Sequence, residues 1–146
     1  MGETKVIAAA RAAVALIVTL ACVSATGADV TCEPPNGFEL RGWVESDGIV
    51  VIYRTEPSTI EIGQPFKVDA IVCVRDPALR ATGLKVDAVM PNHRHGMNYR
   101  PQVSAQGDSR YLAEGLLFHM PGRWRFLFGV DVPGRTEHLW QDIELE

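Results

Sequence analysis

From residue 49 onward, apolar and polar side chains alternate along the chain with a period of two. The clearest case is residues 66–74, where every second residue from Phe66 is apolar while Lys67 and Asp69 face the opposite way. Such alternation is typical of β-strands that bury one face. Six further segments continue the pattern, at 49–53, 84–90, 101–105, 111–117, 124–130 and 139–145. No stretch of ten or more residues after residue 28 has the spacing of an amphipathic helix.

Turn-forming residues separate the predicted strands, for example Pro57-Ser58, Asp76-Pro77 and Pro133-Gly134. The chain is therefore predicted to be all-β. About seven short strands in roughly 110 residues favour an antiparallel β-sandwich with immunoglobulin-like architecture. A small β-barrel is the alternative. The Cys–Trp–Cys spacing of antibody domains is absent, so the prediction concerns architecture alone.

The first 28 residues have the pattern of a secretory signal peptide. Two basic residues precede an apolar run over residues 12–25, and small residues follow it. The run is shorter than the roughly 20 residues that a transmembrane helix needs. We therefore expect cleavage near Ala25 or Ala28 and export to the periplasm or beyond. A lipoprotein processed at Cys22 is the alternative, and membrane contact is expected only if the segment is retained or lipidated.

The same patterns divide the chain into three parts. Residues 1–28 are the signal peptide, residues 29–56 form an N-terminal segment with one cysteine and the first strand, and residues 57–146 form the sandwich domain. The net charge is −4 at pH 7. Because nucleic-acid binding requires a basic surface, we expect no nucleic-acid partner.

Two cysteines, Cys32 and Cys73, follow the signal peptide. In an oxidising compartment we expect them to form a disulfide. The strand pattern agrees with this, because Cys73 falls on the side opposite the apolar face, where the segment that carries Cys32 can cross it. Two unrelated buried thiols are the alternative.

Motifs of common enzymes are missing from the chain. There is no Gly-x-Ser-x-Gly elbow, no glycine-rich phosphate loop, no dinucleotide-binding fingerprint and no His-Glu-x-x-His pair. The acidic residues are scattered and are typical of a solvated surface. We therefore expect a binding protein rather than an enzyme.

Histidine and methionine are concentrated in two short segments. After residue 28 the chain has three methionines and four histidines, and six of these seven lie at Met90, His93, His95, Met97, His119 and Met120. In an extended segment side chains alternate, so His93, His95 and Met97 are predicted to share one side. Antiparallel strands joined by short loops bring both segments to the same end of the domain. The same reasoning places His138 at the opposite end.

Imidazole and thioether groups together indicate copper. Soft thioether sulfur selects Cu(I), and imidazole binds both copper states. Zinc would more naturally use cysteine, histidine and carboxylate. We therefore expect copper at the six residues of the two segments. The alternative is structural, with Met90 and Met120 filling the core and the histidines bonded to backbone carbonyls.

The two segments also resemble the YtkA-like and FixH-like exported domains. The resemblance rests on Met90 to Tyr99, MPNHRHGMNY, and on Ala113 to Trp124, AEGLLFHMPGRW, and covers about residues 57–145. It implies a small periplasmic β-sandwich that handles copper in cytochrome oxidase assembly or respiratory electron transfer, with copper at the same six residues. FixH-like proteins usually keep a membrane anchor, and the short apolar run here departs from that pattern.

A second hypothesis is a metal-free interaction module of a cytochrome oxidase assembly or electron-transfer system. Between residues 93 and 125 five arginines accompany only two acidic residues. Such a local excess can steer an acidic periplasmic partner. The candidate partner-binding residues are Arg94, Arg100, Arg123 and Arg125. The alternative is that these arginines merely solvate the sheet.

Overall fold

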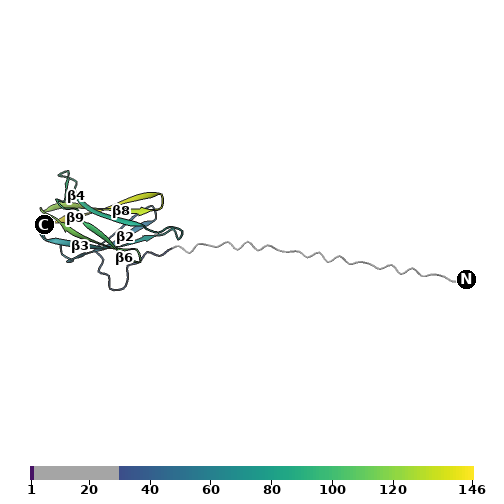
Figure 1. Cartoon of the computed structure of the whole chain (residues 1–146). Helices are drawn as coiled ribbons and strands as arrows, with labels where there is room; N and C mark the ends of the chain where they lie inside the picture. The colour runs from purple at the N-terminus through teal and green to yellow at the C-terminus, as the bar shows by residue number, and fades with distance from the viewer. Residues whose placement is uncertain (2–29) are drawn as a thin grey trace.

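The computed structural model describes Met1 and residues 30–146. Apart from Met1, the predicted signal peptide and the alternative lipid site at Cys22 therefore lie outside the described residues. Every regular element in the described part of the chain is a β-strand, and the strands form two antiparallel sheets (Figure 1). The all-β prediction and the two-sheet sandwich are thereby confirmed. None of the described residues forms a helix with the length and hydrophobicity that crossing a bilayer requires.

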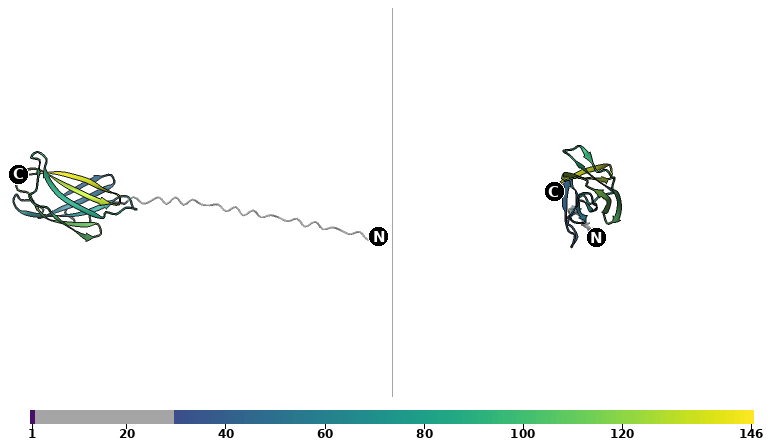
Figure 2. Two further views of the ribbon diagram at one scale, coloured as in Figure 1. Left: turned by 45° about the horizontal axis from the view of Figure 1, so that its top comes forward. Right: turned by 90° about the vertical axis from the view of Figure 1, so that its left-hand side faces the viewer.

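The two sheets contain five and four strands. Sheet A has the spatial order β1 (Gly42–Ser46), β2 (Ile49–Glu56), β3 (Pro65–Val74), β7 (Arg110–Leu117) and β6 (Gln102–Gly107). Sheet B has the order β5 (His95–Gly96), β4 (Gly83–Met90), β8 (Gly122–Val132) and β9 (Arg135–Leu145). Figure 2 shows the sandwich from a second side and along its long axis. Seven of these strands correspond to the predicted segments, whereas β1 and β5 were not predicted.

The inner faces of the two sheets carry the apolar positions that the alternation marked. On β3, Phe66 and Val68 are at most 3% exposed, whereas Lys67 lies in solvent. On β8, Trp124 and Phe126 are fully buried, and the ring centres of Phe66 and Phe126 lie 6.2 Å apart across the sandwich. Burial of each such side chain contributes about 1.5–3 kcal/mol. The period-two pattern thus places the core correctly.

Asp69 departs from the expected pattern, because it is predicted to face solvent beside Lys67 but is only 3% exposed. Its carboxylate accepts hydrogen bonds from Arg54 on β2 at 2.9 Å and from Arg110 on β7 at 2.7 Å. Burial raises the pKa of Asp69, but the hydrogen bonds from Arg110 and Arg54 outweigh it and leave the pKa below its ordinary value. The outer face of sheet A therefore holds a three-strand ion cluster.

This ion cluster predicts a loss of stability in acid. A carboxyl whose folded pKa is lowered contributes its full stability above the unfolded pKa, at about pH 4, and loses it as the pH falls through the folded pKa. We expect Asp69→Asn to lower the free energy of unfolding at pH 7 by about 1–3 kcal/mol. We also expect the variant to show a weaker dependence on pH below about pH 4. Urea unfolding from neutral to acidic pH measures both, and a variant with the wild-type pH profile would contradict the prediction.

The N-terminal segment covers the outer face of sheet A and forms a second small core there. Cys32 is 5% exposed and packs with Val50 and Ile52 of β2, while Phe38 and Cys73 are partly buried against them. Cys32 and Cys73 form a disulfide with a Cα–Cα distance of 5.8 Å. The predicted disulfide is thus confirmed, and so is the predicted crossing of the segment over the outer face of β3.

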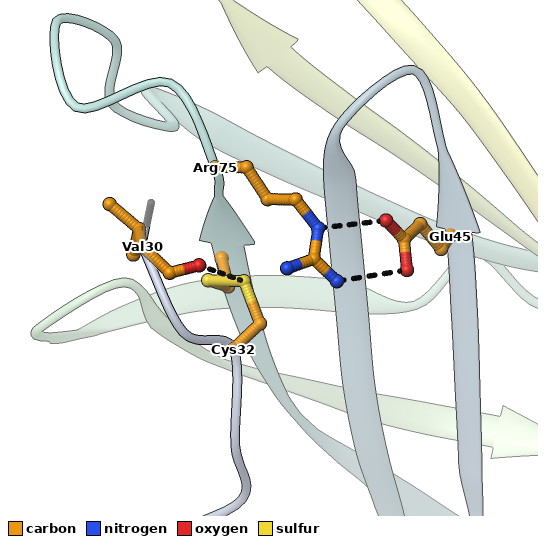
Figure 3. Close-up of a disulfide and its surroundings, with 5 residues drawn as sticks. Val30, Cys32, Glu45 and Arg75 are labelled. Carbon is orange, nitrogen blue, oxygen red and sulfur yellow. Dashed lines mark hydrogen bonds and ion pairs between the residues drawn. A yellow bond between two sulfur atoms is a disulfide. The ribbon is translucent and has the colours of Figure 1, made fainter. Parts of the chain in front are cut away.

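Figure 3 shows the disulfide at the end of β3, with an ion pair between Arg75 and Glu45 beside it. The Arg75 guanidinium donates to both Glu45 oxygens, at 2.8 and 3.2 Å, and so joins the end of β3 to β1. β2 pairs with β3 from Ile49 to Glu56. Residues 42–56 therefore contribute two strands to sheet A.

Candidate metal site

Both His/Met segments lie at one end of the sandwich. β4 in sheet B ends at Met90, and β7 in sheet A ends at Leu117, so each segment continues from a strand that finishes there. The ring centres of His95 and His119 lie 5.2 Å apart, and those of His93 and His95 lie 5.8 Å apart. The prediction that the two segments meet is therefore confirmed. β4 and β7 end on the same side of the domain, as the predicted strand directions require, although they belong to different sheets.

His93 lies in a tight turn. The N–H groups of His93 and Arg94 both donate to the Met90 carbonyl, at 3.1 and 3.0 Å, and Arg94 has a φ of 56°. The prediction of an extended segment is therefore wrong for residues 91–94. The reason is that β4 and β5 are joined as a hairpin, and an alternating pattern of side chains predicts strands but not the turn between them. The turn leaves His93 exposed at the outer side of the His/Met cluster, which is the group of histidines and methionines that the two segments bring together at this end.

His95 points inward, toward the end of the core. It pairs with Met90 in the β4–β5 ladder, and residues directly opposite one another in such a ladder project to the same face. The Nδ1 atom of His95 lies 3.1 Å from the Gly96 carbonyl oxygen. Because a carbonyl only accepts, Nδ1 is the donor in this contact, and Nε2 is the nitrogen of that tautomer that can bind a metal. A histidine that ligates a metal commonly has this arrangement.

His119 follows β7 and carries an unusual buried atom. Its Nδ1 is inaccessible to solvent and has no hydrogen-bond partner among the described residues. Leaving a buried polar atom without a partner costs about 1–3 kcal/mol, so such atoms are rare and require an explanation. A metal ion that binds this nitrogen is one such explanation, and the neighbouring His95 ring can supply a second ligand.

Trp124 of β8 packs against both inner histidines. Its indole is completely buried, and its ring centre lies 5.4 Å from that of His119 and 6.2 Å from that of His95. The indole N–H donates to the Met120 carbonyl at 3.0 Å. Sequence analysis placed Trp124 on a strand but assigned it no role at the site. Its position four residues after Met120, in the second His/Met segment, was the available signal.

The three methionines of the two His/Met segments differ in exposure. Met90 is 1% exposed and belongs to the main core, whereas Met97 and Met120 are partly buried at its edge. A Cβ on residue 122 would lie 3.3 Å from the Met90 methyl group, so Gly122 leaves room for that methyl. Met90 therefore packs the core, as the structural alternative expects, while Met97 and Met120 are placed beside the histidines in sequence and at the same edge.

The donor atoms at this end suit a soft ion better than a hard one. Two imidazoles that share one ion at about 2.0 Å place their ring centres roughly 5–6 Å apart, which agrees with the spacings found here. In the described part of the chain, no group of three or more His, Cys, Asp or Glu side chains is arranged to hold a metal ion. A complete ligand set at this end therefore requires thioether sulfur, which Met97 and Met120 can provide.

The candidate partner-binding arginines are in different environments. Arg94 and Arg100 are exposed, and Arg123 donates to the Asn92 side chain at 2.8 Å. Arg125 is bound by both oxygens of Asp142, at 2.6 and 2.9 Å, and its hydrogen bond lowers the pKa of Asp142. Its charge is therefore compensated, and the basic surface is smaller than the sequence indicates.

His138 lies away from the cluster. It is exposed on β9 and pairs with Gly129, whereas the cluster adjoins Gly122 at the start of β8. The predicted separation of His138 from the other three histidines is therefore confirmed.

Comparisons of the chain with models of protein families, with curated proteins and with solved structures find no match. The function of the protein is therefore argued from the site itself.

Proposed function

We propose that this protein is an exported copper-binding protein that holds one Cu(I) ion in a mixed His/Met site. The observation that carries the proposal is the buried, unpartnered Nδ1 of His119, next to a His95 ring whose Nδ1 is bonded to a carbonyl. The inner ligands are His95 and His119. Met97 and Met120, at the edge of the core, complete the coordination, and His93 lies exposed on the turn beside them.

The choice of copper follows from the chemistry of the donors. Thioether and imidazole ligands favour Cu(I), whereas Mg²⁺ and Ca²⁺ require several oxygen ligands. The segments 90–97 and 118–122 contain no carboxylate. Structural zinc sites commonly use cysteine, and both cysteines of the described chain are in the disulfide. Zinc sites without cysteine use histidine and carboxylate, and these two segments offer thioether in place of carboxylate.

The biological role that we propose is copper handling or metallation of the respiratory chain in the periplasm. The resemblance of both His/Met segments to YtkA-like and FixH-like domains, which are small β-sandwiches, supports this role, and the two-sheet sandwich agrees with it. The disulfide supports an oxidising compartment. An acidic periplasmic protein that gives or receives copper is the partner that the exposed arginines would favour.

The direct test is to load the protein with metal. Mature protein produced by export is titrated with Cu(I) in the presence of a colorimetric chelator, and the bound metal is measured after gel filtration. We expect one equivalent of Cu(I) with high affinity and weak binding of Zn²⁺. His138→Ala is the matched control and should bind like the wild type. Failure to retain Cu(I) would overturn the proposal.

The second candidate is a metal-free interaction module for an acidic partner. Three exposed arginines near the site, Arg94, Arg100 and Arg123, favour it, and Arg125 contributes less because Asp142 compensates its charge. A protein that binds no Cu(I) but captures an acidic partner in a salt-dependent manner would fit this candidate.

A further inference from the structure

We infer that Trp124 is the positioning residue of the metal site: its indole fixes the two inner imidazoles and the Met120 backbone, and its emission reports the bound ion. This inference rests on the proposed function, because it presumes an ion between His95 and His119. It concerns a residue that donates no ligand atom itself.

The indole contacts both inner histidines in the same manner. The ring planes of His119 and Trp124 meet at 82°, and those of His95 and Trp124 meet at 74°, both edge-to-face. Edge-to-face contacts between rings are attractive and directional. One buried side chain therefore restricts the orientation of two imidazoles that come from different sheets.

Trp124 is itself held in place from behind. Phe118 stacks on the indole with ring centres 4.3 Å apart and an interplanar angle of 18°, and both side chains are fully buried. Phe118 directly precedes His119, so the stacked pair also fixes the start of the second His/Met segment. The indole thus cannot turn aside when an ion enters.

The indole N–H makes the second contribution. It donates to the Met120 carbonyl, which fixes the backbone that carries the Met120 thioether. Because this donor is already engaged, it does not satisfy the buried Nδ1 of His119. Trp124 therefore packs against the His119 ring without forming a hydrogen bond to its Nδ1.

Loss of such a supporting side chain has a known scale in metal sites. Residues that orient ligands without binding the metal typically change affinity by about 10–100-fold when they are replaced. We expect Trp124→Phe to weaken Cu(I) binding by about 10-fold, since phenylalanine keeps an aromatic ring but lacks the N–H donor. The double variant Trp43→Phe/Trp140→Phe is the matched control, because both of these tryptophans are exposed.

The control variant also provides a spectroscopic test, because it leaves Trp124 as the sole tryptophan. We expect Cu(I) to quench its emission in proportion to binding, with saturation at one equivalent. Ag(I) serves as a second soft probe that undergoes no redox change. An ion that binds away from Trp124 would leave its emission unchanged. This measurement does not depend on whether Trp124→Phe folds.

The outcomes separate this inference from the proposed function. If the double variant binds Cu(I) with wild-type affinity but its emission does not change, Trp124 has no role at the site and the proposed function stands. A folded Trp124→Phe protein with wild-type Cu(I) affinity would also overturn the inference. If the wild type itself binds no Cu(I), the proposed function falls and this inference falls with it.

Discussion

His119→Phe is expected to lose at least about 100-fold in Cu(I) affinity, which exceeds the usual effect of replacing a residue that only supports a ligand. The replacement keeps an aromatic ring against Trp124 but removes both nitrogen atoms. Since the buried Nδ1 of His119 has no partner among the described residues, its removal also relieves an unsatisfied polar group. A competitive Cu(I) titration of the variant and the wild type measures the change.

The stability of the metal-free variant distinguishes a ligand from a structural histidine. If His119 is a ligand, the metal-free His119→Phe protein should unfold at the same or a higher urea concentration than the wild type, because the unsatisfied atom costs about 1–3 kcal/mol. A structural histidine predicts the reverse, with lower stability and unchanged Cu(I) affinity. That second result would remove His119 from the site.

A graded series of variants follows from the differences in burial. His95→Ala should weaken binding strongly, because His95 faces the core beside His119. His93→Ala should have a smaller effect, because His93 is exposed on the turn. Met97→Leu should also weaken binding, since leucine preserves the apolar packing and lacks sulfur. Equal affinities across the series would show that the cluster only packs.

The second large effect is expected from the disulfide. Cys32→Ala/Cys73→Ala should lower the free energy of unfolding by about 4 kcal/mol, as the chain-entropy relation gives for a loop of this size. The bond joins residues separated by 41 positions and fixes the N-terminal segment over the second core. Denaturant unfolding of oxidised wild type and of the double variant at equal pH measures the loss.

The same variant provides a control for the metal site. Cys73 lies near the end of β3 that is remote from the cluster, because Phe66 at the other end pairs with Leu116 of β7. Cu(I) affinity should therefore be unchanged while stability falls. Equal stability of the two proteins would mean that the segment remains in place without the bond, and would contradict the prediction.

Local patterns in the sequence were sufficient to identify the core. Burial in a two-sheet sandwich depends on which face a residue occupies, and the alternation of residues 66–74 specifies that face directly. Asp69 was misplaced because its burial depends on Arg54 and Arg110, which reach it from the strands on either side. Cross-strand partners are set by the pairing of distant segments, which the alternation within one strand does not contain.

The candidate site was predictable in position but not in detail. Strand direction alone brings the two His/Met segments to one end, so the meeting of His95 and His119 followed from counting antiparallel strands. The turn at His93 and the two-residue strand β5 were not predictable in this way, since so short a strand has no periodicity of its own. The sequence did not distinguish Met90, which is buried in the core, from Met97 and Met120 at the edge of the core. That difference depends on the packing of the Met90 methyl group against Gly122.

The register of β9 has a practical consequence for every metal measurement described above. Leu145 pairs with Gly122, so the C-terminus emerges at the same end of the sandwich as the cluster (Figure 1). An oligohistidine tag joined after Glu146 would place additional imidazoles beside the native ones and compete for the same ion. Val30 lies beside Cys73, near the opposite end of β3, a 10-residue strand that spans roughly 30 Å. Purification handles and surface attachments therefore belong just before residue 30 and after the predicted cleavage site, where they leave the histidine-bearing end open to solution.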